Sequence, residues 1–236
     1  MRLHEMTNYE ELSSRAAELL AAQITSKPDS VIGFATGATP MGLYKELIKM
    51  YNNGLISFEK IVSFNLDEYY GLLSDDPNSY RRYMEEDLFG YVDMNATNIH
   101  IPNGNCEDIA AECGAYDNAI AAAGGIDFQI LGLGHDGHIG FNMPSDEFIY
   151  DTHLALLSDR TRQANARFFD NRIENVPSHA ITLGMSGITG AKHILLLSKG
   201  FKKRAVLDAA MNGPITPLLP ASILQKHDNI DIFYCD

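Results

Sequence analysis

The sequence predicts an α/β fold, with an open, mostly parallel twisted sheet and helices on both faces. Short, near-continuous apolar runs alternate along the chain with amphipathic helical patterns, and polar clusters follow directly after three of those runs. Strands that are apolar on both faces are typical of a parallel sheet, and the intervening helices cover it on both sides. The 236 residues contain no repeat, low-complexity tract or linker, so we expect one domain over residues 1–236.

The alternation begins with a helix over 9–26, whose apolar residues recur at helical spacing, and the apolar strand Val31–Ala35. A second helix follows Pro40 and precedes a strand at 61–66. Further predicted elements are a helix near 107–123, strands at 128–132 and 193–197, a helix at about 201–212 and a last strand at 230–234. Ligands of open α/β sheets bind beyond the carboxyl ends of the strands. The polar clusters at 36–40, 67–68 and 134–138 therefore predict a site at that edge.

Composition excludes several classes of partner and location. The chain is 45% hydrophobic, and 18 Lys and Arg against 31 Asp and Glu give a formal charge of −13. We therefore expect neither nucleic acid nor an anionic membrane as a partner. No apolar run approaches the roughly 20 residues of a membrane span, and residues 1–5 lead into a polar, helix-like segment without the apolar core of a secretion signal. The three cysteines, Cys106, Cys113 and Cys235, form no CxxC pair, which favours a reduced, cytoplasmic protein.

The first polar cluster is Thr36-Gly37-Ala38-Thr39-Pro40, between a strand and a helix. A tight glycine turn with hydroxyls at a helix start aims free backbone N–H groups at an anion. The cluster is neither GxxxxGK[ST] nor GxGxxG, so it does not indicate a nucleotide. The alternative is that the cluster only caps the helix.

The second cluster places Asp67 and Glu68 directly after an apolar strand. A carboxylate at that position could act as a general base on a bound substrate. A helix-capping Asp or a solvated acidic pair explains the same residues, and the residues alone do not decide between these interpretations.

The third cluster lies in Gly132–Asn142, which has four glycines in nine residues and contains His135, Asp136 and His138. Glycine-rich backbone turns sharply or approaches a ligand closely, and a carboxylate beside an imidazole fixes the tautomer of a catalytic base. Metal binding and a purely structural turn are the alternatives, but the HxxH spacing matches no zinc signature. No GxSxG nucleophile motif is present, and we expect neither a metal nor a cofactor.

Four segments together resemble the glucosamine-6-phosphate deaminase (isomerase) family, namely Ala35–Pro40, Asn65–Tyr69, Asp136–Asn142 and Asn165–Phe169. The resemblance runs from about residue 9 to the end of the chain. The wider superfamily also contains 6-phosphogluconolactonase, which shares the Asp-Gly-His turn. The resemblance implies a modified Rossmann-like sheet and an enzyme that opens the ring of an amino-hexose 6-phosphate, isomerises aldose to ketose and releases ammonia.

The resemblance also implies a role for each site residue. His138 would move the proton in ring opening, Asp136 would orient it, and Asp67 would carry a proton from C2 to C1. The substrate-binding residues would be Thr36, Gly37, Ala38 and Thr39 on the phosphate, Glu68 next to Asp67, and Arg167 and Lys203 reaching the phosphate from other segments. Salt-bridged surface positions are the alternative for the last two.

Two positions depart from the family pattern. Met143 stands where the family usually has a glutamate that supports the histidine, and a thioether is no strong acceptor. Either Asp146 or Glu147 replaces that carboxylate, or the substrate is the galacto epimer. Ala155 cannot supply the basic residue on which allosteric control of larger relatives depends, so we do not expect that control here.

Three functions thus compete, and each predicts a different assay result. A hexosamine-6-phosphate deaminase releases ammonia, a sugar-phosphate lactonase produces acid and does not need Asp67, and a sensor binds without turnover. The deaminase is the prediction because the four segments occur in combination. The partner expected is a small sugar phosphate, and the sequence does not decide between a monomer and a homo-oligomer.

Overall fold

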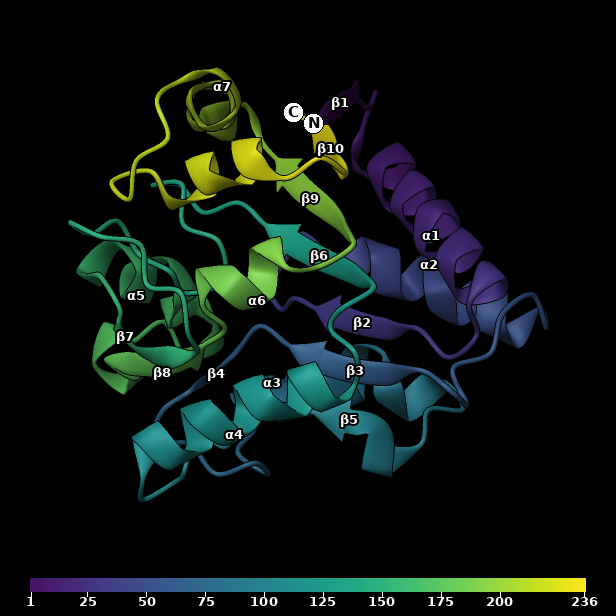
Figure 1. The fold of residues 1–236 in the computed structure, drawn as a ribbon, viewed down its shortest axis with the longest axis horizontal. Helices are drawn as coiled ribbons and strands as arrows, with labels where there is room; N and C mark the ends of the chain where they lie inside the picture. The colour runs from purple at the N-terminus through teal and green to yellow at the C-terminus, as the bar shows by residue number, and fades with distance from the viewer.

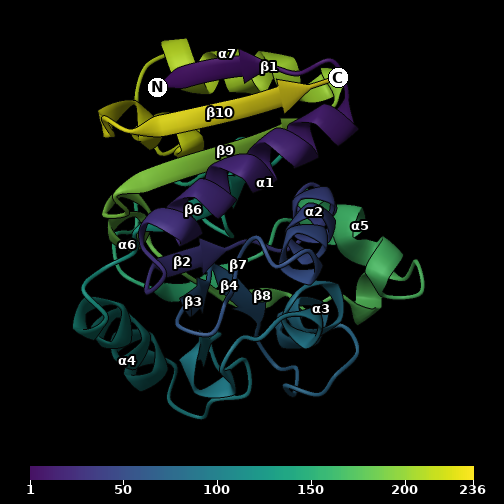
Figure 2. The same ribbon diagram turned by 90° about the vertical axis from the view of Figure 1, so that its right-hand side faces the viewer.

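The computed structural model describes residues 1–236 and contains a large parallel sheet and a small antiparallel one (Figures 1 and 2). All six strand pairings of the large sheet are parallel. The strand order is β1 (Arg2–Glu5), β10 (Ile230–Cys235), β9 (His193–Lys199), β6 (Phe128–Gly132), β2 (Val31–Phe34), β3 (Val62–Asn65) and β5 (Ile99–His100). The predicted parallel sheet is confirmed.

Helices cover both faces of this sheet. Figure 1 shows α1 (Tyr9–Ser26) and α2 (Met41–Asn52) on one side, and α4 (Ile109–Ala122), α6 (Met185–Thr189) and α7 (Arg204–Asn212) on the other. The Asn8 side chain accepts a hydrogen bond from the Glu11 N–H and so caps the start of α1, while the apolar stripe of that helix is buried. The helix expected at 201–212 begins as a 3-10 turn over Phe201–Lys203 and continues as α7.

A small sheet that the sequence pattern does not predict lies at one end of the molecule. It pairs β4 (Asp67–Tyr69), β8 (His179–Thr182) and β7 (His153–Leu156) in antiparallel order. Tyr69, Phe141 and Phe169 join the eight-residue apolar cluster beneath it, and α3 (Tyr80–Asp87) and α5 (Asp159–Asn165) flank it. In Figure 2 the arrows of β2 and β10 point toward the side where α5 lies. The small sheet therefore carries Asp67 beyond the carboxyl ends of the parallel strands.

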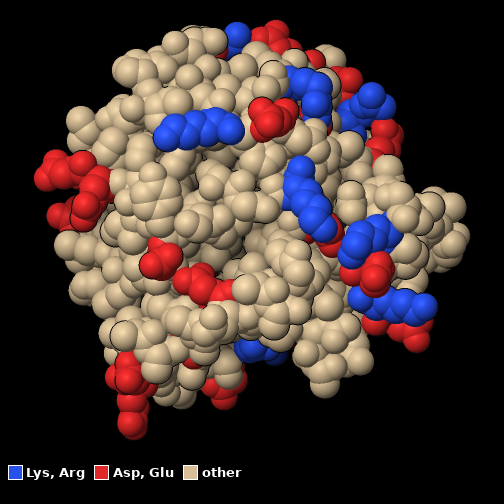
Figure 3. Space-filling model, in the orientation of Figure 1, with Lys and Arg blue, Asp and Glu red and all other residues tan.

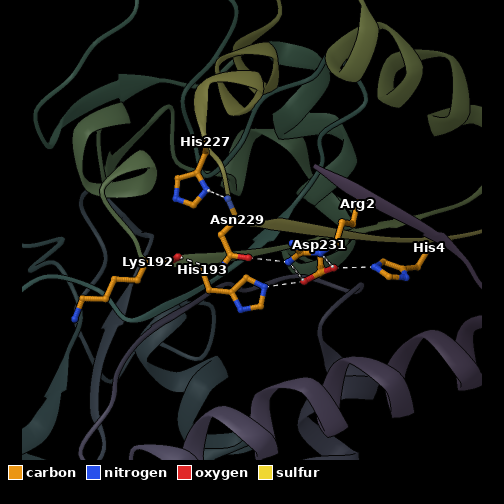
Figure 4. A network of polar contacts seen from close by, with 7 residues as sticks. All are labelled: Arg2, His4, Lys192, His193, His227, Asn229 and Asp231. Atoms are coloured by element: carbon orange, nitrogen blue, oxygen red, sulfur yellow. Dashed lines mark hydrogen bonds and ion pairs between the residues drawn. The ribbon is translucent and has the colours of Figure 1, made fainter.

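The edge strand β1 is tied down by polar contacts around Asp231 (Figure 4). Arg2 donates to both carboxylate oxygens of Asp231 at 2.8 and 2.7 Å, and the ring nitrogens of His4 and His193 lie 2.7 and 2.8 Å from them. The Arg2 side chain lowers the pKa of Asp231, with the histidines adding to its effect. Because these residues come from β1, β10 and β9, one buried carboxylate holds three strands together.

A single apolar cluster of 47 buried residues fills the space between the large sheet and its helices.

On the face shown in Figure 3, acidic and basic side chains are interspersed around a mostly uncharged centre. None of the helices combines the length and the apolar character that a membrane span requires.

Candidate active site

A cavity of about 510 Å³ opens beyond the carboxyl ends of the parallel strands. Its walls are the segment 35–40 after β2, Leu66 and Asp67 after β3, 132–141 after β6, and 199–203 after β9, with 160–167 from α5 and the turn behind it on the remaining side. The structure thus brings together residues from all three polar clusters that the sequence singles out. Open α/β sheets bind their ligands at this position, beyond the carboxyl ends of the strands.

The turn at 36–39 presents unused backbone donors to the cavity. Gly37 has a φ of +107°, and the N–H groups of Thr36, Gly37, Ala38 and Thr39 donate no hydrogen bond within the protein. Two backbone carbonyl groups of the turn accept hydrogen bonds from tyrosine hydroxyls. The Tyr9 hydroxyl lies 2.9 Å from the Thr39 oxygen, and the Tyr83 hydroxyl lies 2.8 Å from the Gly37 oxygen. Four free N–H groups ahead of α2 form a site for an anion.

Two of the cations that line the cavity are the predicted ones, Arg167 and Lys203. Lys203 Nζ donates to the Leu133 carbonyl at 2.5 Å, and the Arg167 guanidinium lies over the Phe168 ring at 4.7 Å. Neither side chain pairs with a carboxylate. Burial lowers the pKa of Lys203, and the charge of Arg167 lowers it further. Both groups therefore gain from an anion placed between them.

The glycine-rich turn, Gly132–Asn142, holds an imidazole–carboxylate pair. His138 Nδ1 lies 2.5 Å from Asp136 Oδ1, and both side chains are about one-fifth exposed. Burial alone would raise the pKa of Asp136, but the hydrogen bond and charge of His138 lower it to about 2. Asp136 is thus ionised at neutral pH and accepts a hydrogen bond from Nδ1–H of His138, which leaves Nε2 as the nitrogen available for proton transfer. Gly134 makes room for the ring, since a Cβ there would lie 2.3 Å from it.

Asp67 is buried beside this turn, and its side-chain carboxyl group has no hydrogen-bond partner in the protein. Its side chain lines the cavity, and its Oδ2 would lie 3.5 Å from a Cβ built on Gly140. Burial, with the charge of Glu68 adding to it, raises the pKa of Asp67 to about 8. A carboxyl group with a pKa near the working pH is suited to accept and return a proton.

Glu68, expected from the resemblance to bind substrate, does not line the cavity. Its buried carboxylate accepts hydrogen bonds from the N–H groups of Tyr69, Tyr80 and Arg81 at 2.8, 2.8 and 3.0 Å. Alternate side chains of a strand point to opposite faces, so the neighbour of Asp67 faces away from the cavity and toward the start of α3. Glu68 therefore holds α3, and with it the cavity-lining Tyr80, against β4.

Comparison with known proteins agrees with this geometry. Residues 5–232 match the family described as glucosamine-6-phosphate isomerases/6-phosphogluconolactonase. A glucosamine-6-phosphate deaminase of Lachnoclostridium phytofermentans is 47% identical over 235 residues, which is 100% of this chain and 99% of that protein. One from Clostridium botulinum is 49% identical over 230 residues, 98% of this chain and 94% of that protein.

The chain belongs to this family. The solved structure of a monomeric glucosamine-6-phosphate deaminase superposes with a TM-score of 0.96 at 43% identity, covering 100% of this chain and 97% of that one. A 6-phosphogluconolactonase from Thermotoga maritima superposes with a TM-score of 0.76 at 19% identity, covering 99% of this chain and 98% of that one. The second likeness shows only that the two proteins share the glucosamine-6-phosphate isomerase/6-phosphogluconolactonase fold.

Neither carboxylate expected to replace the usual glutamate of the family lies at the site. Asp146 and Glu147 are exposed and do not line the cavity. Met143 is half-buried against the apolar cluster of the small sheet, and the Thr161 hydroxyl lies 3.6 Å from its sulfur. The expectation that one of the two acidic residues substitutes is therefore wrong for this arrangement.

Several residues that line the cavity are not singled out by the sequence patterns, namely Tyr80, Arg160, Thr161 and Lys199. Lys199 is the last residue of β9, so the rule that places ligands at strand ends could have found it. No group of three or more His, Cys, Asp or Glu side chains is placed to hold a metal ion.

Proposed function

We propose that this protein is a glucosamine-6-phosphate deaminase, which converts glucosamine 6-phosphate and water into fructose 6-phosphate and ammonia. The observation that carries the proposal is near-complete coverage at 47–49% identity by proteins of that name. The cavity independently supports it, because an anion site, an imidazole–carboxylate pair and a buried carboxyl group with a raised pKa surround one space.

The sugar is oriented by its phosphate. The N–H groups of the 36–39 turn and the cations Arg167 and Lys203 bind the phosphate oxygens at one end of the cavity. This binding places the pyranose ring at the other end, beside His138 and Asp67. His138 takes the proton of the C1 hydroxyl and gives a proton to the ring oxygen as the C1–O bond of the ring breaks. Asp136 keeps the imidazole in the tautomer that this exchange needs.

Asp67 then performs the isomerisation. It removes the proton from C2 of the open chain and returns it to C1. One proton also leaves the amino group and one reaches the aldehyde oxygen, so that the aldehyde carbon becomes a hydroxymethyl group and C2 becomes an imine. Water adds to the imine carbon and ammonia leaves, which gives fructose 6-phosphate. The ammonium group of the bound sugar favours the ionised form of Asp67, which burial otherwise disfavours.

The two alternatives have less support. The solved 6-phosphogluconolactonase structures are only 17–19% identical to this chain, and a lactonase has no use for a buried general base at Asp67. The galacto epimer has no specific observation in its favour, since the relatives are glucosamine-6-phosphate enzymes. We further propose that the enzyme works in the cytoplasm, because all three of its cysteines are free.

The experiment is a side-by-side assay of ammonia release from glucosamine 6-phosphate and galactosamine 6-phosphate, and of acid release from 6-phosphogluconolactone. Ammonia from the gluco sugar, with fructose 6-phosphate formed in equal amount, is the expected result. Asp67→Asn serves as the control, because it preserves the shape of the cavity but cannot take a proton. Acid release from the lactone without any ammonia from either sugar would overturn the proposal.

A further inference from the structure

Two cations that line the cavity, Lys199 and Arg160, have no part in the function proposed above. Eight of the 18 Lys and Arg side chains form an ion pair with Asp or Glu, and none of these eight lines the cavity. The four cations that line this cavity are Arg160, Arg167, Lys199 and Lys203, and no carboxylate lies within ion-pair distance of any of them. The cavity therefore holds more uncompensated positive charge than Arg167 and Lys203 alone supply.

Lys199 has the better-defined position of the two unassigned cations. It is the last residue of β9, and its ammonium nitrogen lies 3.7 Å from the centre of the Tyr9 ring. Tyr9 is the residue that holds the 36–39 turn, since its hydroxyl lies 2.9 Å from the Thr39 oxygen and 3.1 Å from the Ala38 oxygen. The same hydroxyl accepts a hydrogen bond from the Gly42 N–H at 2.8 Å. Tyr9 thus contacts both Lys199 and the 36–39 turn, and so places the lysine next to the anion site.

The contact with Tyr9 holds the ammonium group without neutralising it. An aromatic face attracts a cation more weakly than a phosphate dianion does, and it leaves the three N–H donors of the lysine free to turn to another acceptor. The flexible four-carbon stem of lysine allows the ammonium group to move from the ring to a nearby anion. If a carboxylate stood in place of the Tyr9 ring, it would pair with the ammonium group and compete with an anionic ligand for it.

We propose that Lys199 is a third phosphate-binding cation of this enzyme, which Tyr9 holds beside the 36–39 turn and which donates to the phosphate when glucosamine 6-phosphate binds. This inference rests on the proposed function, because it takes the 36–39 turn as the phosphate site. Arg160 is not included, since no contact in the structure fixes the position of its guanidinium.

The test compares Lys199→Gln and Lys199→Arg with Lys202→Gln, a matched control on the neighbouring exposed lysine. Ammonia release from glucosamine 6-phosphate gives KM and kcat, and competitive inhibition by inorganic phosphate gives a second measure of anion affinity. Each is measured at low salt and at 0.5 M salt, because screening removes long-range attraction but leaves a direct contact largely intact. Thermal unfolding checks that the variants are folded.

We expect Lys199→Gln to raise KM and the inhibition constant of phosphate about tenfold, the cost of one charge-assisted hydrogen bond, with little change in kcat. Lys199→Arg should restore most of the affinity, and the loss should persist at high salt. A KM within twofold of wild type, or an equal rise in Lys202→Gln, would overturn the inference. An inactive wild-type protein would instead contradict the proposed function, so the two failures are distinct.

Discussion

Gly134 is the position where one added methyl group should disable the catalytic histidine. A Cβ built on Gly134 would lie 2.3 Å from both Cε1 and Nδ1 of His138 and 2.5 Å from its Cγ. These atoms span the ring, so in Gly134→Ala the whole imidazole must move by roughly 1 Å, the difference from an ordinary contact of about 3.5 Å. The hydrogen bond between Nδ1 and Asp136, 2.5 Å long, cannot survive this displacement unchanged.

We expect kcat of Gly134→Ala to fall about 100-fold, because a misplacement of about 1 Å in a catalytic group costs that much. KM should change little, since the 36–39 turn and its cations are untouched. The assay is ammonia release from glucosamine 6-phosphate, with thermal unfolding alongside it.

The matched control is Gly114→Ala in α4, where a Cβ would meet nothing within 4 Å. It should leave the rate unchanged and stabilise the fold by about 0.4–1 kcal/mol. A kcat for Gly134→Ala within threefold of the control would refute the placement of His138 over this glycine.

Three further predictions concern buried carboxyl groups. Asp67→Asn should lower kcat by about 10²–10⁴-fold with KM preserved. It should also raise the melting temperature at pH 8 and above, because the cost of ionising buried Asp67 grows as pH rises from its ordinary pKa of 3.8 to about 8. Glu68→Gln should move the acidic limb of the kcat/KM profile to lower pH, since a negative charge that raises the pKa of Asp67 is removed; an unmoved limb would contradict this coupling. Asp231→Asn should destabilise the fold by about 1–3 kcal/mol without changing kcat. Asp231 has a lowered pKa, so the difference from wild type in urea unfolding should be present at neutral pH and vanish in strong acid; a constant difference would contradict the charge network.

The longer helices and strands could be predicted because the spacing of their apolar residues follows from which positions are buried. The helix expected at 9–26 and the strand expected at 128–132 coincide with α1 and β6. The strand β1 could not be predicted, because three of its four residues are exposed and its stability comes from Asp231, more than 200 residues away in the chain. The small sheet escaped for a similar reason, since strands of three and four residues carry too few positions for a pattern and pair with distant segments.

The part of the site that lies directly after the parallel strands could be predicted from the sequence. Parallel strands bring their carboxyl ends to one edge, so the 36–39 turn and the glycine-rich turn had to meet once the sheet was parallel. The closeness of Asp67 and Gly140 follows instead from the pairing of β4 with β8, which no local pattern encodes. The opposite orientations of Asp67 and Glu68 follow from the same short strand.

Met143 raises the question of whether a missing glutamate limits this enzyme. Its side chain packs against the apolar cluster of the small sheet, and it is not among the residues that line the cavity. Met143→Glu should therefore place a carboxylate among apolar groups with the Thr161 hydroxyl as its near partner, and lower the stability by about 1–3 kcal/mol. We expect kcat/KM to fall or stay constant on both glucosamine 6-phosphate and galactosamine 6-phosphate, because His138 already has Asp136 as its partner. Met143→Leu, which keeps the apolar volume, is the control and should match wild type. A rise in kcat/KM on the gluco sugar alone would show that the new carboxylate reaches His138, and that ring opening in the native enzyme is slow for want of it.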